Sequence, residues 1–466
     1  MGSRRKALVA ALAVSSLLSG CAVGPRYERP TTALPGAFIE KGPWKDATPR
    51  DHLPKGRWWA IYQDGTLEQW VERANEASPT LQAAVARRDQ AWALARMDRA
   101  NLFPSLSVNP SADRGRGQTR NASTGSRTDN AFSLPANLSY ELDLWGRVRK
   151  LAESGRALAE ASEADYHNAL LSVQADVVIS YFSLRSLEVE HTLLTRTVES
   201  RRRSLDIVKR RFQLGASGDY EVSLAETELA TAESDLLANE RERAAYKVMV
   251  AVLCGALPES FIPVVSADPL PLPPTIPLAL PSELLERRPD VASAERTLAA
   301  SHAQIGVAKA AYFPSINLLG SAGFASGELS DLLRWDSRIW SIGSAISLPI
   351  FQGGRLRANV DRAQAVYQEA FAGYRQSVLV AFRDVETALS DLRTLSDQSE
   401  VLDRAVASSQ RASELVGVRY RSGQIGYLDV TAAERTAIAN ERLALQVREQ
   451  QLIASVQLIR ALGGGW

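Results

Sequence analysis

The feature that most constrains this chain is a strand-to-helix switch that is written twice. The stretch LSYELDLWGRVRK, Leu138 to Lys150, alternates apolar and polar residues and then, past Gly146, opens a long run with helical spacing. A near-copy, ISLPIFQGGRLRA, begins at Ile346, which is 208 positions later. Alternation indicates a strand with one wet face, and the spacing beyond it indicates a helix. One chain therefore makes the same structural unit twice.

Self-comparison extends the duplication to most of the sequence. Before the switch the offset is 210, because Phe103-Pro104-Ser105 recurs as Phe313-Pro314-Ser315. After the switch it is 208, as in Gly146-Arg147 and Gly354-Arg355, so a two-residue difference must lie between Ser105 and Gly146. We predict repeats over 78–257 and 282–466, each with a short helix, two strands and a long helical hairpin. The Pro-rich segment 258–281 between them is predicted to be an extended linker.

Each repeat contributes one pair of antiparallel strands. In the first repeat a strand is predicted over 132–144, its partner begins near Pro104, and the polar stretch 111–131 is predicted as an exposed loop between them. The second repeat has strands near 316–324 and 340–350, joined by the polar link 325–338. Thirteen residues span about 43 Å, enough to cross an outer membrane with tilt. The apolar residues expected to face the membrane are Phe132, Leu134, Leu138, Tyr140, Ile316, Leu318, Trp340, Ile342 and Ile346.

The strands lead into very long helices. Between Arg147 and Gln213 there is no proline and a single glycine, Gly155, which favours one uninterrupted helix. Every seventh residue from Leu170 to Phe212 is apolar except His191, and this heptad seam predicts lengthwise packing against another helix. His191 is interpreted as a tolerated polar residue of the seam rather than a metal ligand. The segment from Gly215 to Gly218 should reverse the chain, and a return helix is expected to start near Asp219.

The N-terminus has the pattern of an export signal. Arg4, Arg5 and Lys6 precede a short apolar run that ends in LSGC, Leu18 to Cys21. A run of this length is too short to span a bilayer permanently. Small residues before a cysteine resemble a bacterial lipobox, so residues 1–20 are predicted to be removed and Cys21 to be lipidated. Residues 21–77 would then form the lipid anchor and an equatorial segment, and Cys254 would be a small core residue.

Composition argues against enzyme chemistry and against nucleic-acid binding. The chain has a net charge of +1, four His, two Cys and three Met. No CxxC or HExxH spacing occurs, and no nucleophile or acid–base set stands out. We therefore expect no catalytic residues, no metal site and no cofactor other than the covalent lipid on Cys21.

Four strands per chain raise the problem of closing a sheet in lipid. Exposed backbone polar groups in a membrane cost several kcal/mol each, so a spanning sheet must have no open edge. About eight strands is the smallest workable barrel, hence the barrel must be shared between copies of the chain. Two copies would fill their own barrel with side chains, whereas three would give twelve strands and room for a lumen.

Several motifs together resemble the TolC-like outer membrane factors, in particular their lipoprotein (OprM/NodT-like) branch. They are CAVGPRYERP at Cys21, WWAIYQD at Trp58, RRPDVASAERTLAASHAQIGVAKAAYFPSINLLGSAGF at Arg287, SLPIFQGGRLRA at Ser347, and the turns RRFQLGASGDY at Arg210 and VRYRSGQIGYLDV at Val418. The resemblance implies an α+β, mostly α-helical homotrimer. Its 12-stranded outer membrane β-barrel would continue into a long periplasmic α-helical barrel, in a Gram-negative bacterium.

The resemblance also implies a function. The protein would be the outer membrane exit duct of a tripartite, RND-type efflux system, passively conducting small molecules delivered by an inner-membrane pump through a periplasmic adaptor. Ala22 is not the Asp that retains some lipoproteins at the inner membrane, which favours the outer one. The alternative is a periplasmic coiled-coil lipoprotein scaffold or adaptor without a pore, for which membrane-crossing strands would have no use.

Two sets of site residues follow from the resemblance. Adaptors of the family dock on the hairpin tips, which here would involve Arg211, Phe212, Gly215, Gly218, Arg419, Tyr420, Gly423 and Gly426. The glycines would permit the tight reversal, and the arginines would hydrogen-bond carbonyls or acidic groups near it. The alternative is that these residues only form the turns. The family closes its tunnel at the same end, so Asp219, Tyr427 and Asp429 are the gate candidates. The family carries an Asp near the position of Ala432, and in this respect the chain departs from its pattern.

Overall fold

The computed structural model describes residues 27–28, 56–117, 127–274, 276 and 287–464. These residues form two compact units, and each unit draws on both sequence repeats. Unit 1 contains Arg87–Glu163 and Ser293–Arg375, together with the described residues near the N-terminus. Unit 2 contains Ala164–Ala292 and Gln376–Trp466, together with the segment that precedes Arg87. The predicted signal peptide, Cys21 and part of the Pro-rich linker lie outside the described residues.

The helices of the two repeats have the same order and the same lengths. The first repeat has α3 (Pro79–Ala100), α4 (Arg147–Gln213) and α5 (Asp219–Leu253), and the second has α7 (Pro289–Ala310), α8 (Arg355–Arg421) and α9 (Tyr427–Ala461). Corresponding helices have equal lengths of 22, 67 and 35 residues. A short 3₁₀ helix, η1 (Trp58–Tyr62), and helix α2 (Gly65–Ala77) come before α3. Among the described helices, none combines the length and the apolar character that crossing a membrane requires.

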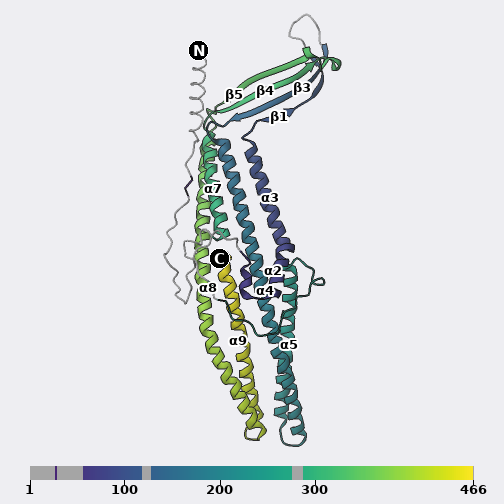
Figure 1. Ribbon diagram of the computed structural model, residues 1–466, viewed down its shortest axis with the longest axis vertical. Coiled ribbons are helices and arrows are strands. Elements are labelled where there is room, and N and C mark those ends of the chain that lie inside the picture. The colour runs from purple at the N-terminus through teal and green to yellow at the C-terminus, as the bar shows by residue number, and fades with distance from the viewer. Residues whose placement is uncertain (1–26, 29–55, 118–126, 275, 277–286, 465–466) are drawn as a thin grey trace. The chain divides into compact units, whose positions relative to one another are not determined.

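Unit 1 holds a single antiparallel sheet, which Figure 1 shows beside the ends of α7, α8 and α3. Its strands are β1 (Ser105–Val108), β2 (Ser111–Gly117), β3 (Arg127–Leu142), β4 (Ser315–Ser326) and β5 (Arg338–Ser347). The order is β1-β3-β4-β5, and β2 also pairs with β3. The link from β4 to β5 contains two short 3₁₀ turns, η3 (Leu329–Asp331) and η4 (Trp335–Ser337).

The prediction of one exposed loop over 111–131 is wrong at both ends. Residues Ser111 to Gly117 form β2, and β3 already begins at Arg127. β1 and β2 keep one register against β3, since Val108 pairs with Ala136 and Ser111 with Ser133. They are interrupted only at Pro110, which has no N–H to donate. This part of the hairpin is polar on both faces, so apolar alternation gives no signal for it.

Two other strand ends differ from the prediction for local reasons. β3 stops at Leu142 because the carboxylate of Asp143 turns to the start of α4, where it accepts from the backbone N–H of Val148 at 3.0 Å and of Arg149 at 2.8 Å. Such a carboxylate satisfies the free N–H groups of a helix start. β5 stops at Ser347, two residues before Pro349, which cannot donate to a ladder.

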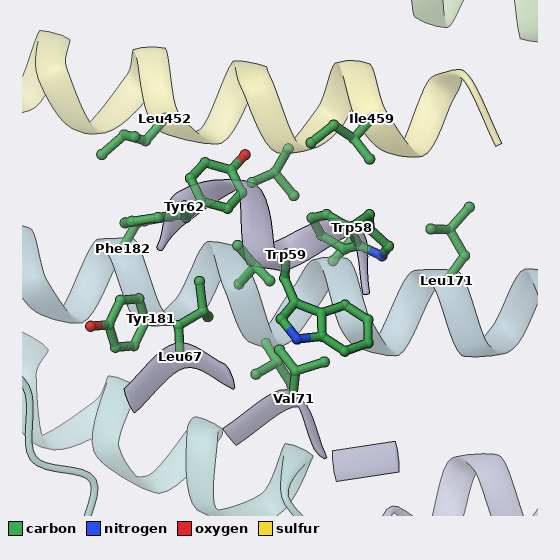
Figure 2. Packing of buried hydrophobic residues seen from close by; sticks show 14 of the residues in the cluster. Trp58, Trp59, Tyr62, Leu67, Val71, Leu171, Tyr181, Phe182, Leu452 and Ile459 are labelled. Atoms are coloured by element: carbon green, nitrogen blue, oxygen red, sulfur yellow. The ribbon is translucent and has the colours of Figure 1, made fainter. Parts of the chain in front are cut away.

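Unit 2 has an aromatic-rich core around η1, shown in Figure 2. Trp58, Trp59 and Tyr62 pack between α4, which contributes Phe182, and α9, which contributes Leu452 and Ile459. Two of the three polar ends are paired, because Trp58 Nε1 donates to Gln174 Oε1 at 3.0 Å and the Tyr62 hydroxyl lies 2.7 Å from Ser455 Oγ, whereas the buried Trp59 Nε1 has no hydrogen-bond partner among the described residues. Cys254 is fully buried with a free thiol, as predicted, and burial raises its pKa to about 11.

The heptad seam of α4 is the buried face of that helix. Val177 and Leu184 are completely buried. A second heptad series on α4, called the companion series, is at most 8% exposed throughout: Val173, Ser180, Leu187, Leu194, Arg201 and Val208. His191 on the seam is partly exposed, and its Nε2 lies 3.7 Å from Glu240 Oε1 on α5. The prediction of lengthwise helix packing is thereby confirmed for the part of α4 in unit 2.

Candidate functional site

The strand register gives the sheet two faces of different chemistry. Ladder partners point to the same face, so Leu138 shares a face with Leu106 on β1 and Gly320 on β4. Following the pairs across β5 adds Ile342 and Trp340 to this face. All nine residues predicted to face the membrane lie on it: Phe132, Leu134, Leu138, Tyr140, Ile316, Leu318, Trp340, Ile342 and Ile346.

The opposite face is polar or small-chained. It carries Ser105, Ser107, Ser133, Asn137, Ser139, Glu141, Asn317, Ser321, Gly323, Ser341, Gly343, Ala345 and Ser347. Leu319 and Ile339 are the apolar exceptions, and they are 45% and 41% exposed. A sheet that is apolar on one face and polar on the other suits a wall between lipid and water. The exposed fractions of Trp340 (77%) and Ile342 (84%) show that this apolar face is uncovered within one chain.

The sheet is not closed by the described residues of one chain. β1 and β2 form one edge, β5 forms the other, and in the described ladder neither edge has a further partner. Both β3 and β5 lead directly into the long helices α4 and α8. Each repeat therefore joins one strand of the sheet to a long helix, the interior strand β3 in the first repeat and the edge strand β5 in the second.

The two hairpin tips are built alike. After α4, the N–H of Gly215 donates to Phe212 O at 2.9 Å and that of Ala216 donates to Arg211 O at 2.8 Å. After α8 the same two bonds occur, from Gly423 to Tyr420 O and from Gln424 to Arg419 O, both at 3.0 Å. This is the Schellman arrangement, and it places its glycine at positive φ, +69° for Gly215 and +75° for Gly423. Gly218 and Gly426 are the N-caps of the return helices.

The tip arginines make contacts other than those expected. The guanidinium of Arg211 lies over the ring of Tyr420, 5.1 Å from its centroid, so it joins the first tip to the second. Arg419 Nε donates to the side-chain oxygen of Gln424 at 3.5 Å, a long contact within its own turn. The expectation of bonds to carbonyls or acidic groups is therefore replaced by a cation–π contact and an amide contact.

The three gate candidates have different surroundings. Tyr427 is 4% exposed and belongs to a small apolar cluster with Leu205, Val208, Ala225 and Val430, and burial raises the pKa of its hydroxyl. Asp429 is exposed, and its carboxylate accepts from the N–H of Gly426 at 3.2 Å. Asp219 is the first residue of α5 and is exposed.

The role of Asp429 as a cap has a counterpart in the first repeat. Glu221, 208 positions earlier, accepts from the N–H of Gly218 at 2.8 Å in the same way. Both carboxylates therefore satisfy the backbone at the start of a return helix. This local role exists whether or not Asp429 also has a role in gating.

A buried ion network near the tips was not predicted from the sequence. Arg201 on α4 is 3% exposed and pairs with two carboxylates, Glu434 on α9 and Glu228 on α5, the latter at 3.7 Å. Glu228, itself 5% exposed, also pairs with Arg435 on α9. Further from the tips, Arg442 on α9 pairs with Glu190 at 2.7 Å and with Asp235 at 3.3 Å. These pairs connect the first hairpin to the second within one chain.

A signal for the network was present in the sequence. Arg201 interrupts the companion seam at a position where the flanking members, Leu194 and Val208, are apolar and buried. A buried charge must be paired, so an arginine in a seam predicts acidic residues on the facing helices.

Comparison with known proteins follows the same duplication. The model of the outer membrane efflux protein family matches residues 70–256 and 280–464. The starts of the two matches differ by 210 and their ends by 208, the same offsets as the repeats. The chain belongs to the outer membrane efflux protein family.

Individual relatives cover nearly the whole chain. Outer membrane protein OprJ of Pseudomonas aeruginosa is 34% identical over 463 residues, which is 98% of this chain and 96% of OprJ. Cation efflux system protein CusC of Escherichia coli O157:H7 is 29% identical over 457 residues, 97% of each chain.

Solved channel structures are similar over the same extent. The outer-membrane channel OprN has a TM-score of 0.88 and 32% identity, covering 96% of this chain and all of OprN. The open state of the Neisseria gonorrhoeae MtrE channel has a TM-score of 0.84 and 30% identity, covering 96% and 98%. As a member of this family, the protein is an outer membrane efflux component with a periplasmic extension, and its family consists of transport channels rather than enzymes.

Proposed function

We propose that the protein is the passive exit duct of a tripartite, RND-type efflux system, conducting small molecules from the periplasm to the outside as a homotrimer. The observation that carries this proposal is the two-faced sheet with open edges that continues directly into two helical hairpins. Unpaired edge groups in lipid cost several kcal/mol each, so the sheet requires a partner of matching length. Another copy of the same sheet supplies that partner.

Closure by three copies is favoured on geometric grounds. Counting β1 and β2 as one interrupted strand, each chain supplies four strands, and three chains supply twelve. The β5 edge of one copy would pair with the β1–β2 edge of the next. A barrel of twelve strands is wide enough to leave an aqueous lumen, whereas eight strands fill their interior with side chains. The polar face with Ser107, Asn137 and Ser321 would line this lumen.

The partners of the duct are proposed to be a periplasmic adaptor, docking at the hairpin tips, and an inner-membrane pump. The tips offer exposed apolar side chains, with Leu214 at 83%, Phe212 at 45% and Tyr220 at 64%. At Gly215 and Gly423 an added Cβ would meet nothing within 4 Å, so their surroundings are open. Small residues beside exposed apolar ones allow a partner helix to approach the turn closely.

The tips are also the proposed site of the gate. The Arg201 network and the Arg211–Tyr420 contact hold the two hairpins of one chain together near their tips. Separation of the hairpins would expose the Glu228 carboxylate, and the buried Tyr427 cluster would open with it. Asp219 and Asp429 at the starts of the return helices are exposed acidic groups, which would attract cations near the closure.

Single-channel conductance in planar bilayers tests the gate. Arg201→Gln leaves Glu228 and Glu434 without their buried cation, which should raise the open probability of the purified channel several-fold. The matched control is Arg202→Gln, because Arg202 is the next residue but pairs with Glu233 on the surface, where its side chain is 61% exposed. If both variants and the unmodified channel have the same open probability, the network has no role in closure.

The lipid anchor is proposed at Cys21. Tyr27, six residues later, is held on unit 1, since its hydroxyl donates to Glu295 Oε1 at 2.7 Å and its ring meets that of His302. The anchor would thus start close to a fixed point. Mass spectrometry of the mature protein should find an acylated Cys21, and Cys21→Ser should lose the acyl mass without losing the channel.

The conduit itself is tested against the alternative of a pore-less coiled-coil scaffold or adaptor. Purified protein reconstituted into liposomes should release a small trapped dye and should run as a heat-sensitive trimer on unheated gels. A scaffold would give neither result, and a water-soluble monomer would exclude the duct.

A further inference from the structure

The end of the sheet away from the helices carries charged residues on both faces. β3 and β5 end where α4 and α8 begin, so the opposite end contains the start of β3, the end of β4 and the link between β4 and β5. Because the helices of this family extend into the periplasm, this end faces the outside. The β2–β3 hairpin continues there by several residue pairs beyond Phe132–Ser326, the last pair of β3 with β4.

On the protruding hairpin, Arg114 and Arg116 lie on the lipid-facing side. Arg114 pairs with Asn130 and Arg116 with Thr128, and both pairs continue the register of the apolar face from Phe132. The aspartates lie on the other face, because Asp113 pairs with Ala131 and Asp129 with Gly115. The register therefore places these two arginines toward the membrane side and the two aspartates toward the lumen, on the same face as the Gly117–Arg127 pair.

The β4–β5 link adds a third arginine to the lipid-facing side. Arg338 pairs with Phe324, a member of the apolar face, and is exposed. Its guanidinium stacks on Trp335, 3.1 Å from the ring centroid, and its Nε donates to Trp335 O at 2.6 Å. Trp335 and Trp340 are 72% and 77% exposed. Arg334, in the same link, forms an ion pair with Asp331 at 3.2 Å.

We infer that Arg114, Arg116 and Arg338, with Trp335, form a contact surface for the phosphorylated lipid headgroups of the outer leaflet. This surface, called the outer rim, continues the apolar band of Trp340, Ile342 and Ile346 toward the outside. Guanidinium groups bind phosphate in bidentate fashion, and tryptophan favours the boundary between acyl chains and headgroups. The inference rests on the proposed function, since it requires the apolar face to be in lipid.

Charge complementarity selects this occupant over others. An anionic lipid matches both the arginines and the apolar band below them. Each arginine near an anionic membrane surface contributes roughly 1 kcal/mol to attraction, which corresponds to a several-fold change in affinity for each side chain. The aspartates on the lumen face would keep the same lipids out of the mouth of the channel.

The test uses the full-length trimer in detergent and purified lipopolysaccharide as the probe. Intact lipopolysaccharide should bind, chemically dephosphorylated lipopolysaccharide should bind about tenfold more weakly, and inorganic phosphate should not compete at millimolar concentration. The double variant Arg114→Gln/Arg338→Gln should lose about tenfold in affinity for the intact probe, while Arg114→Lys/Arg338→Lys should retain most of it. Arg357→Gln is the control, because Arg357 is similarly exposed but lies at the start of α8, at the other end of the barrel.

The outcomes separate this inference from the proposed function. If the double Gln variant forms no heat-sensitive trimer, the double Lys variant replaces it in the binding measurement, because it keeps both charges and should assemble. If every variant assembles and the Gln pair binds as tightly as Arg357→Gln, the outer rim is refuted while the duct stands. Competition by inorganic phosphate alone would indicate a free-anion site and would also refute the lipid. Failure of the unmodified chain to form a membrane-inserted trimer would refute the duct itself.

Discussion

At the residue scale, Asp429 was predicted as a gate residue and has an observed local role that the sequence did not suggest. The sequence suggested a charge at the gate, and the structure shows a helix cap on Gly426. Asp429→Ala removes the acceptor and should lower the free energy of unfolding by about 1 kcal/mol. Asp429→Asn keeps an acceptor oxygen without the charge and should cost less than half of that. Denaturation of the purified trimer measures both.

The same two variants separate capping from gating. If the charge of Asp429 contributes to the gate, Asn and Ala should reduce cation selectivity equally, although only Ala is markedly destabilised. A selectivity change confined to the Ala variant would show that the effect comes from the lost cap. Glu221→Ala in the first repeat provides the reference for a cap without gate function, because Glu221 holds Gly218 in the same way.

Glu449 on α9 predicts a pH dependence of stability. Burial raises its pKa above the ordinary value of 4.5, although Ser183 Oγ donates to its carboxylate at 2.6 Å. Because the folded state favours the protonated form, this contribution to stability is greatest below pH 4.5 and is lost as the pH rises through the raised pKa. Glu449→Gln, which is always neutral, should therefore unfold at a higher temperature than the unmodified protein at pH 7.5.

The control for Glu449 is an exposed carboxylate on α8. Glu414, which is 68% exposed and pairs with Arg411, has no burial to relieve. Glu414→Gln should leave the midpoint unchanged between pH 4 and pH 7.5, and at pH 4 Glu449→Gln should match the unmodified protein. A Glu449 variant that gains nothing at pH 7.5 would contradict the raised pKa.

At the element scale, two glycines at helix ends have a similar positive φ but should differ in how much an alanine destabilises the protein. Gly215 and Gly255 have φ of +69° and +66°, so an alanine is strained by a similar amount, about 1 kcal/mol, at each. At Gly215 its Cβ would meet nothing within 4 Å, but at Gly255 it would lie 2.2 Å from Ala77 O. Gly255→Ala should therefore lower the yield of folded trimer strongly, whereas Gly215→Ala should lower stability only slightly.

A second pair checks that the contrast comes from packing. Gly463, the counterpart of Gly255 in the second repeat, would bring a Cβ to 2.7 Å from Arg287 O. Gly423, the counterpart of Gly215, again has open space. Gly463→Ala should therefore lower the yield of folded trimer strongly, and Gly423→Ala should lower stability only slightly. Thermal unfolding and unheated gels of the four variants decide it, and a mild Gly255→Ala would refute the close approach.

Prediction from sequence succeeded where the pattern repeats and failed where local chemistry overrides it. The constant offset of 208 located α4, α5, α8 and α9, since these helices contain no proline and follow heptad spacing. The strand faces followed from alternation, and the register places all nine apolar positions on one face, while their contact with the membrane stays a prediction. β2 was missed because a polar hairpin carries no periodic signal. The Arg201 network was missed because partners on other helices cannot be read from spacing along one helix.

At the scale of the whole molecule, the two faces of the sheet determine whether an assembled barrel can sit in lipid. Neighbouring residues of β5 point to opposite faces, so Ile342 lies on the apolar face and Ser341 on the polar one. The same new charge on these two residues is therefore an internally matched comparison. Both variants change the same strand, which pairs with β4, and both change the net charge by the same amount.

Ile342→Arg should prevent accumulation of the inserted trimer, while Ser341→Arg should permit it. An arginine on the lipid face near the middle of the bilayer costs about 2–4 kcal/mol in each chain, and threefold symmetry repeats this cost three times. On the lumen face the same side chain stays in water and should instead shift conductance toward anions. Outer membrane fractionation, unheated gels and conductance measure these effects. Equal trimer yields from both variants would mean that the apolar face is not in contact with lipid, and the assignment of β5 to the membrane wall would fall with it.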